Sequence, residues 1–348
     1  MRILFAGTPS CAVPALNLIA REFDLCGVLT NPPAPAGRNK KMQDSDAALA
    51  VKELIKEGVL PEDFSVLTPQ KLDDNFRKEL EALKPDLLVC FAYGKIFGPK
   101  TMALFPLGGI NIHPSLLPRW RGCAPVPAAI LAGDKLTGIT IQTLAQKTDC
   151  GSILGQLEIP LNDSETTESL LADCADKCCP LLRDVLSDFE NKLKQARPQE
   201  EAKALYCSML KKEDGLIDWS KPAEEIERKI RAFTPWPGCF TFKKGEKISI
   251  IEANLYEDAS NEMTKNKKFG TILGTDKKCG ILIQTGNGIL AVSVLQKQAK
   301  KKLSRFDNVI IKKAEITSLK AKDCMFDGTS CERFFEEMGY DDVVFEVA

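Results

Sequence analysis

Two side chains that could assist acyl transfer stand two residues apart, at Asn111 and His113, and His113 is the only histidine in the 348-residue chain. The apolar run at 109–112 predicts a buried strand, in which residues at i and i+2 project from the same face. Pro114 favours an extended backbone at His113, which keeps the two side chains aligned. Singly, a histidine is more often structural and an asparagine at a strand end often forms a turn. As a pair, they can donate hydrogen bonds to the oxygen of an acyl group under attack, which indicates an acyl-transfer site.

A carboxylate beside His113 would favour the charged imidazole, and Asp149 is the best candidate for that partner. It lies between two further predicted strands, at 137–144 and 152–159, where a loop can approach the same edge of the sheet. Considered alone, Asp149 would be an ordinary turn aspartate. Beside His113, it could orient the imidazole and help to move a proton.

The residues after His113 form an unusual loop that contains Ser115, Leu116, Leu117 and Pro118. We expect both leucines to be exposed, because a loop after a strand usually runs over the surface. Exposed leucines beside a proline are suited to contact a flat heterocycle. Since ligands of open α/β sheets bind beyond the carboxyl ends of the strands, this loop is predicted to be a wall of the site.

The elements that would position these side chains alternate along the first part of the chain. Short apolar, β-branched runs followed by amphipathic stretches predict an α/β domain with a Rossmann-like, mainly parallel sheet covered on both faces. The predicted strands are 3–6, 25–29, 86–91, 109–112, 137–144 and 152–159, and the predicted helices are 12–20, 47–57, 76–83, 124–131 and 168–194.

By composition the chain divides into four parts. Residues 1–194 form the predicted catalytic domain, and 195–206, which are polar and contain Pro198, predict a linker. In 207–322 one helix precedes five short strand-like runs, which is typical of a small, OB-like β-barrel domain. Those runs are 239–242, 247–253, 271–273, 280–285 and 288–294. Residues 323–348 form an acidic tail.

Charge is unevenly distributed, although the formal net charge is only −1. Residues 207–322 contain about 23 basic and about 14 acidic residues, whereas 323–348 contain about one basic and about eight acidic residues. Solvated surface lysines explain most such excesses, but a basic domain can also bind a polyanion such as a nucleic acid.

The 13 cysteines are scattered and form no Cys-x-x-Cys pair, which favours free thiols in a reducing cytoplasm. The closest cluster, at Cys174, Cys178 and Cys179, has no histidine nearby, so we expect no metal site. No apolar run reaches the roughly 18 residues of a membrane span, and the N-terminus does not resemble a signal peptide. We therefore expect a cytoplasmic protein with no membrane partner, and nothing indicates an obligatory protein partner.

The pattern Asn-x-His-x-Ser-Leu-Leu-Pro at 111–118, followed by Asp-x-Gly at 149–151, resembles the family of 10-formyltetrahydrofolate-dependent formyltransferases. The likeness continues to about residue 295, and its segments in the second domain narrow it to the tRNA-modifying branch of the family. The other matching segments are 5–9, 35–38, 92–94, 119–125, 217–220 and 230–238.

This resemblance implies transfer of a formyl group from 10-formyltetrahydrofolate to the α-amine of methionine on initiator tRNA, a step in the initiation of translation. In the family pattern, Asn111 and His113 would stabilise the tetrahedral oxyanion. Asp149 would orient and charge His113 and help to pass the amine proton, through water, to the departing folate nitrogen. Residues 115–118 match the loop that contacts the folate, and no metal is implied.

The first long loop, residues 31–46, resembles the family's tRNA-reading insertion. Its basic residues Arg38, Lys40 and Lys41 would bind phosphates and base edges of the tRNA. Arg38 matches the arginine that senses the end of the acceptor stem, and a solvated flexible loop is the alternative. The chain departs from the family pattern at Ala34, where a basic residue is usual.

Three other functions stay open. A formyltransferase could act on a small amine, such as a ribonucleotide or an amino sugar nucleotide, but that substrate would require neither a basic domain nor the Arg38 loop. A dinucleotide-dependent oxidoreductase is disfavoured because residues 7–10, Gly-Thr-Pro-Ser, lack the Gly-x-Gly-x-x-Gly turn. A catalytically inactive RNA-binding protein is disfavoured by the presence of Asn111, His113 and Asp149.

Overall fold

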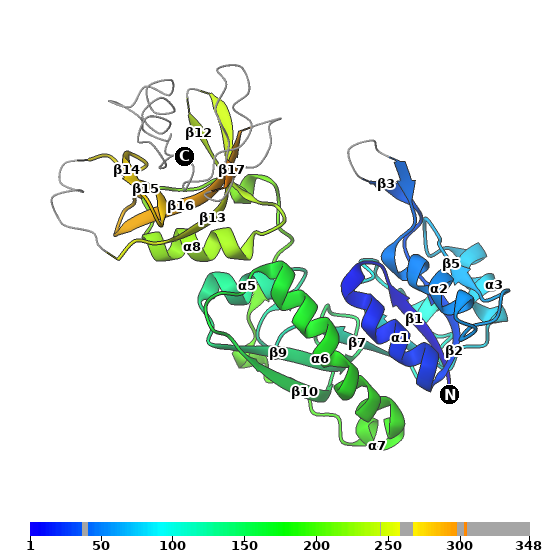
Figure 1. The fold of residues 1–348 in the computed structure, drawn as a ribbon. Helices are drawn as coiled ribbons and strands as arrows, with labels where there is room; N and C mark the ends of the chain where they lie inside the picture. The colour runs from blue at the N-terminus through cyan, green and yellow to red at the C-terminus, as the bar shows by residue number, and fades with distance from the viewer. Residues whose placement is uncertain (37–40, 244, 258–266, 298–302, 305–348) are drawn as a thin grey trace. The chain divides into compact units, whose positions relative to one another are not determined.

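The computed structural model describes residues 1–36, 41–243, 245–257, 267–297 and 303–304 (Figure 1). The chain forms two compact units, each with its own β-sheet. The first unit comprises Met1–Ala129, Lys135–Asn162 and Ser169–Ser208, and the second comprises Ile130–Asp134, Asp163–Glu168 and the chain from Met209 onward.

The first unit is built on a seven-stranded sheet in the order β10-β9-β7-β6-β1-β2-β5. From β5 to β7 the neighbouring strands are parallel, and β9 and β10 add an antiparallel hairpin at one edge. The strands are Arg2–Gly7 (β1), Asp24–Leu29 (β2), Val66–Leu67 (β5), Leu87–Phe91 (β6), Gly109–His113 (β7), Leu136–Thr143 (β9) and Ile153–Pro160 (β10). This confirms the expected Rossmann-like, mainly parallel architecture.

The strands of this sheet are apolar on both faces, so both faces must be covered. Leu4 and Leu88 pack with Phe76 of α3 on one face, and Ile3 and Phe5, which alternate with Leu4, are fully buried on the other. Helix α1 packs against β1, β2 and α2. The helices up to residue 194 are Val13–Glu22 (α1), Asp46–Lys56 (α2), Asp74–Ala82 (α3), Pro99–Met102 (α4), Pro125–Ala132 (α5), Thr167–Ser187 (α6) and Phe189–Lys194 (α7), with a 3-10 turn at Ser10–Ala12 (η1).

The antiparallel register between β7 and β9 aligns polar side chains near the end of β7. Asn111 lies opposite Gln142, and His113 lies opposite Thr140. Directly opposite residues of such a pair project from the same face of the sheet, so these four side chains form one group. Ile112, between the two β7 residues, is buried on the other face.

Residues 195–208, which we call the strap, belong to the first unit. Arg197 forms an isolated bridge with Ile153 at the start of β10. Two short strands, Arg121–Gly122 (β8) and Tyr206–Cys207 (β11), pair in parallel, and Glu201–Lys203 form a 3-10 turn (η2). The segment that the sequence suggests as a linker is therefore hydrogen-bonded to the sheet of the first unit and to β8.

In the described part of the second unit, helix α8 packs on an antiparallel sheet, in the order β12-β13-β16-β15-β14 with β17 also paired to β16. Trp219 is fully buried and donates a hydrogen bond from Nε1 to Oγ1 of Thr241. The elements are Glu213–Gly215 (η3), Ala223–Ala232 (α8), Cys239–Lys243 (β12), Glu246–Leu255 (β13), Ile272–Asp276 (β14), Gly280–Gln284 (β15), Ile289–Lys297 (β16) and Leu303–Ser304 (β17). The expected class of this domain, small and antiparallel, is confirmed.

Two local features differ from the expectation. The single helix expected at 168–194 is interrupted at Asp188, whose backbone leaves the helical region with φ −131° and ψ 41°, so α6 and α7 are separate. In the first long loop, Ala34–Ala36 (β3) and Lys41–Gln43 (β4) pair as a hairpin. Their three-residue length gives too short an alternation for the sequence to reveal.

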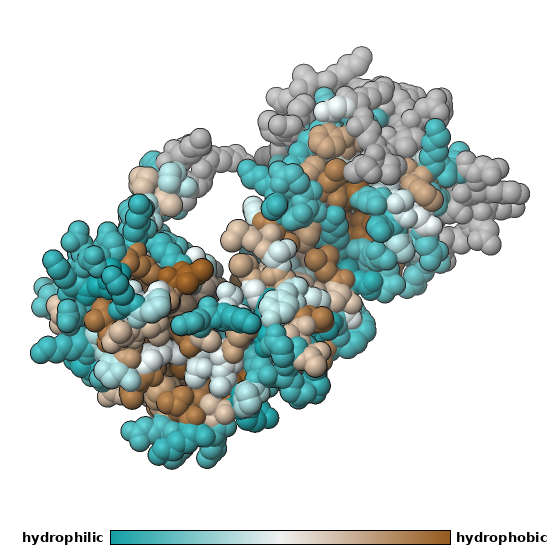
Figure 2. Space-filling view, turned by 180° about the vertical axis from the view of Figure 1, so that it is seen from behind, coloured by the Kyte–Doolittle hydropathy of each residue, from teal (hydrophilic) through white to brown (hydrophobic). Residues whose placement is uncertain are grey.

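Polar and apolar residues share the molecular surface shown in Figure 2. Within the described ranges, no helix is both long enough and apolar enough to cross a membrane. The predicted acidic tail, 323–348, lies outside the described residues.

Candidate active site

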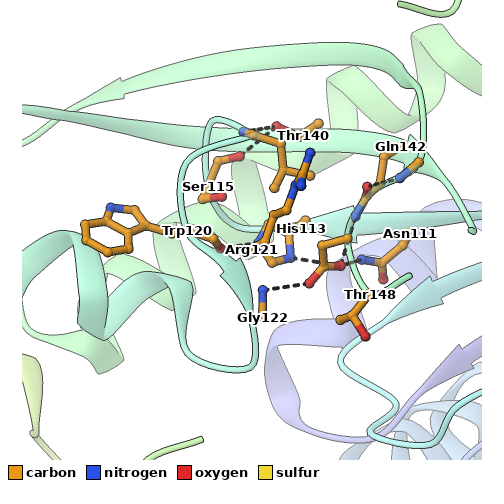
Figure 3. Close-up of polar contacts among 12 residues, drawn as sticks. Asn111, His113, Ser115, Trp120, Arg121, Gly122, Thr140, Gln142 and Thr148 are labelled. Carbon is orange, nitrogen blue, oxygen red and sulfur yellow. Dashed lines mark hydrogen bonds and ion pairs between the residues drawn. The ribbon is translucent and has the colours of Figure 1, made fainter. Parts of the chain in front are cut away.

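The three predicted catalytic side chains, Asn111, His113 and Asp149, come together at the carboxyl end of β7. Figure 3 labels Asn111 and His113 there. Nδ2 of Asn111 lies 3.5 Å and Nδ1 of His113 lies 3.6 Å from Oδ1 of Asp149. This edge of an open α/β sheet is where such folds bind ligands. The period-2 spacing and the loop aspartate therefore do converge in one site.

His113 is held between two hydrogen-bond acceptors. It is 4% exposed, and its Nε2 lies 2.9 Å from the carbonyl oxygen of Trp120. Because a carbonyl can only accept, Nε2 must carry a hydrogen. On the other side of the ring, Nδ1 faces the Asp149 carboxylate, which also accepts. The imidazole ring is therefore held between the backbone of Trp120 and the side chain of Asp149.

Asp149 is surrounded by donors. Its Oδ2 accepts the backbone N–H of Gly122 at 2.9 Å, and its Oδ1 accepts an N–H of Gln142 at 2.9 Å. Asn111 and His113 approach Oδ1 from farther away, and Figure 3 shows these four residues converging. The backbone of Gly122 and the side chain of Gln142 therefore hold one carboxyl oxygen of Asp149 each.

Left-handed backbone conformations cluster at this site. The φ angles are 62° at Trp120, 114° at Gly122 and 53° at Asp149. Such values are uncommon for residues other than glycine, and this kind of strain gathers at functional sites. The turn at Trp120 and Gly122 aims a carbonyl at His113 and an N–H at Asp149, so one turn orients both side chains.

Two glycines of the site have no room for a side chain. A Cβ on Gly122 would lie 2.1 Å from the carbonyl oxygen of Cys207, and a Cβ on Gly151 would lie 1.6 Å from that of Thr143. Both obstacles are backbone atoms of paired segments, which cannot move without breaking their pairing. The close approach of the loops around Asp149 therefore requires glycine at both positions.

The predicted ligand-binding loop is tied to β9. Oγ1 of Thr140 donates to the carbonyl of Ser115 at 2.7 Å and accepts the N–H of Leu117 at 3.0 Å. Leu117 is only 3% exposed and Ser115 is buried, whereas Leu116 and Pro118 are partly exposed. The expectation of two exposed leucines is therefore wrong for Leu117, because its backbone is held against Thr140 and its side chain packs in the core.

Two thiols whose titration is affected by Asp149 are held in the neutral form. Burial raises the pKa of Cys90 to about 12 and also raises the pKa of Cys207, and the negative charge of Asp149 adds to both. Because the thiolate is the nucleophilic form of cysteine, neither residue is suited to form a covalent acyl intermediate.

Of the residues predicted to bind tRNA, Lys41 begins β4 and is exposed. Arg38 and Lys40 lie outside the described residues. In the part of the chain that the structure describes, no three potential metal-ligating side chains form a group.

Three residues that the sequence analysis did not select, Gln142, Gln199 and Arg121, also belong to the site. Gln142 and Arg121 are each 1% exposed, and the two glutamines contact each other behind Asp149. Gln142 could have been noticed, because it and Thr140 are polar residues at alternate positions of an apolar strand. No local pattern reveals that the strap brings Gln199 to this place.

Comparison with known protein families agrees with the fold and the site. A family model described as Formyl transferase matches residues 1–186, and one described as Formyl transferase, C-terminal domain, matches residues 209–309. The first match alone covers more than half of the chain. The chain therefore belongs to the formyl transferase family.

Individual relatives narrow this class. Over 303 residues the chain is 97% identical to a methionyl-tRNA formyltransferase of Treponema denticola, an alignment that covers 87% of this chain and 94% of the relative. With the same coverage, it is 49% identical to a methionyl-tRNA formyltransferase of Treponema pallidum. Within the family, the chain is thus grouped with the methionyl-tRNA formyltransferases.

Solved structures with this fold are more distant in sequence. WlaRD, a sugar 3N-formyl transferase solved in the presence of dTDP and 5-N-formyl-THF, matches with a TM-score of 0.58 and 17% identity, over 86% of this chain and 98% of its own. HypX from Aquifex aeolicus, solved in complex with tetrahydrofolic acid, matches with a TM-score of 0.55 and 17% identity, over 87% of this chain and 45% of its own. At these identities the likeness establishes the shared fold.

Proposed function

We propose that this protein transfers the formyl group of 10-formyltetrahydrofolate to the α-amine of methionine on initiator methionyl-tRNA, in the cytoplasm, at the initiation of translation. The 97% identity to a methionyl-tRNA formyltransferase supports the choice of acceptor. The observation that carries the chemistry is the convergence of Asn111, His113 and Asp149 at the carboxyl end of β7.

In the proposed reaction, the amine nitrogen of methionine attacks the formyl carbon, so a new C–N bond forms and the formyl oxygen becomes anionic. Collapse of this tetrahedral intermediate breaks the bond between the same carbon and N10 of the folate. The amine gives up one proton and N10 gains one, so the reaction requires oxyanion stabilisation and one proton transfer.

Asn111 and His113 are proposed to stabilise the oxyanion. Nδ2 of Asn111 and Nδ1 of His113 lie 3.5 and 3.6 Å from Oδ1 of Asp149. Both distances are longer than an ordinary N–H···O hydrogen bond. These N–H groups are therefore not committed to strong partners, and a developing negative charge on a substrate oxygen can attract them. Removing one such donor typically lowers the rate by about 10²–10³-fold.

Asp149 is proposed to keep His113 charged and aligned, and to pass the amine proton towards N10 through a water molecule. Its short hydrogen bonds from Gly122 and Gln142 fix both carboxylate oxygens, so the carboxylate cannot turn away from the imidazole. A fixed carboxylate also stabilises the positive charge on His113 while the neighbouring oxyanion forms.

Residues 115–118 are proposed to contact the folate, as their resemblance to the family loop implies. The partly exposed Leu116 and Pro118 offer apolar surface for a flat ring system. Ser115 and Leu117 are buried and their backbone groups bond to Thr140, so they would act by holding the loop in place. The donor set fits this substrate, because the two N–H donors of β7 and the apolar surface of the loop that follows it are the kinds of groups that line heterocycle sites.

Arg38, Lys40 and Lys41 are proposed to contact the tRNA, and the basic domain at 207–322 is proposed to bind its phosphate backbone. Lysine and arginine side chains supply this kind of sequence-independent affinity. A basic loop together with a basic domain suits a large polyanionic acceptor better than a small amine.

The test is a formylation assay with purified protein and 10-formyltetrahydrofolate, run with initiator methionyl-tRNA and, separately, with a small ribonucleotide amine. We expect formylation of the tRNA only, and a loss of most of the rate in His113→Ala. Full activity of His113→Ala would contradict the mechanism. Formylation of the small amine without formylation of the tRNA would contradict the acceptor.

A further inference from the structure

A chain of hydrogen-bonded side chains ends on the carboxylate of Asp149. Nε of Arg121 donates to Oε1 of Gln199 at 2.9 Å, and Nε2 of Gln199 lies 3.1 Å from Oε1 of Gln142. Nε2 of Gln142 then donates to Oδ1 of Asp149 at 2.9 Å. The four residues come from β8, the strap, β9 and the loop after β9, all within the first unit.

The donors and acceptors of this series of hydrogen bonds run in one fixed direction. Nε of Arg121 can only donate, so the amide oxygen of Gln199 must face it and the amide nitrogen must point the other way. There the nitrogen meets only acceptors, namely Oε1 of Gln142 and the carbonyl oxygens of Asp149 and Gly151, the latter two at 2.9 and 2.8 Å. The orientation of Gln199 is therefore determined by its partners.

The same reasoning orients Gln142. Its Oε1 faces two donors, Nε2 of Gln199 at 3.1 Å and the N–H of Gly151 at 3.1 Å. Its amide nitrogen must then face Asp149, where the carboxylate requires a donor. A flipped Gln142 would place an amide oxygen against a carboxylate oxygen and an NH₂ group against two donors.

Arg121, the first residue of this hydrogen-bond series, is firmly held. Arg121 is 1% exposed, and its NH1 donates to Oε2 of Glu201 and to the hydroxyl of Tyr206, both at 2.8 Å. A buried guanidinium without such partners would be strongly unfavourable, so breaking these contacts is opposed by the cost of an unpaired charge. The strap therefore fixes Arg121, and Arg121 fixes the direction of both amides.

We propose that Gln142, oriented by Gln199 and Arg121, is a positioning residue for formyl transfer; this rests on the proposed function. Gln142 supplies the short hydrogen bond to Oδ1 of Asp149. That bond holds the carboxylate in place and satisfies this oxygen, so the more distant N–H groups of Asn111 and His113 stay available to the substrate oxygen. Without it, these two donors would be drawn towards Asp149.

The test replaces Gln142 by methionine, which has a similar length but cannot donate, in the full-length protein. We expect the single-turnover rate of methionyl-tRNA formylation to fall about 10- to 100-fold, and the KM values of both substrates to change by less than about twofold. The matched control is Gln70→Met, which makes the same substitution at an exposed glutamine of the first unit, outside the proposed site. That variant should keep the wild-type rate.

A double-mutant cycle distinguishes positioning from a general loss of structure. In an Asp149→Asn background, Gln142→Met should lower the remaining rate by less than about twofold, because its target carboxylate is gone. An equal loss in both backgrounds, or a loss confined to KM, would overturn the proposal. Should Gln142→Met fail to fold, Gln199→Met serves instead, and it should lower the rate while Gln142 is still present; an unchanged rate there would overturn the proposal.

These outcomes are separable from the proposed function itself. A wild-type protein that does not formylate methionyl-tRNA overturns the proposed function, and this inference with it. An active wild-type protein with an equally active Gln142→Met variant overturns only the positioning role.

Discussion

Replacing Asp149 by asparagine changes one atom of the side chain and tests the site most directly. The carboxylate accepts two short hydrogen bonds, from the backbone N–H of Gly122 and from the amide of Gln142, both at 2.9 Å. An asparagine offers one oxygen and one NH₂ group, so it can accept only one of the two. The other donor then faces an NH₂ group in either orientation.

In Asp149→Asn, Gly122 and Gln142 cannot rearrange without losing other contacts. The N–H of Gly122 belongs to the backbone and cannot rotate, and a flip of Gln142 would break its contacts with Gln199 and Gly151. A buried donor left unsatisfied costs about 1–3 kcal/mol, so the free energy of unfolding should fall by about that amount. The loss of the negative charge beside His113 and of the proton relay should lower the formylation rate by about 10²–10⁴-fold.

The assay pairs single-turnover formylation of methionyl-tRNA with urea unfolding of the same preparations. Asp63→Asn is the control, because it makes the same substitution at an exposed position outside the site. Its free energy of unfolding should change by less than about 0.5 kcal/mol, with no change in rate. If Asp149→Asn retained a rate within about threefold of wild type, neither the charge nor the relay could be important, and the reasoning would be refuted.

Three further predictions concern the scaffold and the polyanion. Gly122→Ala should lower both the unfolding free energy and the formylation rate, because its Cβ would meet a backbone oxygen at 2.1 Å; Gly58→Ala, with φ 72° and open space, should cost only about 1–2 kcal/mol in urea unfolding and leave the rate unchanged. The pKa values of the buried thiols Cys90 and Cys239 are raised from 9.0 to about 12, so the unfolded chain loses these protons at lower pH than the folded one. Under reducing conditions, the unfolding free energy should therefore be constant below pH 9 with respect to these groups and fall as the pH rises from 9 towards 12; equal values on both sides of pH 9 would contradict this. Finally, if residues 207–322 bind phosphates, the logarithm of the tRNA association constant should fall linearly with the logarithm of the salt concentration. An association constant that does not change with salt would exclude phosphate binding by this domain.

The sequence predicts most of the sheet because its strands are short apolar runs that obey local rules. The runs at 3–6, 25–29 and 109–112 each lie within an observed parallel strand. The alignment of Asn111 and His113 was predictable for the same reason, since alternation along one strand depends on local geometry. Their contact with Asp149 was expected from the order of the strands.

The supporting residues were not predictable, because their contacts depend on pairing between distant segments. Gln142 reaches the site through the β7–β9 register, and Gln199 meets Asp149 across 50 positions of sequence. A polar stretch with a proline is typical of a linker, and nothing in its composition reveals that the amide nitrogen of Gln199 lies within hydrogen-bond distance of three oxygen atoms. The burial of Leu117 was missed similarly, since it depends on a hydrogen bond to Thr140 in another strand.

The position of the strap has a consequence for the synthesis of this protein on the ribosome. A nascent chain that has emerged as far as residue 186 already contains every residue proposed to take part directly in formyl transfer. It still lacks Gln199, which orients the side-chain amide of Gln142 that bonds to Asp149, and it lacks β11, which pairs with β8. Because that pairing ends at Cys207, the proposed site can be aligned only when the last strand of the first unit has been made. Truncated chains intended to isolate this unit should therefore end after residue 208, even though the match to the N-terminal family model ends at 186.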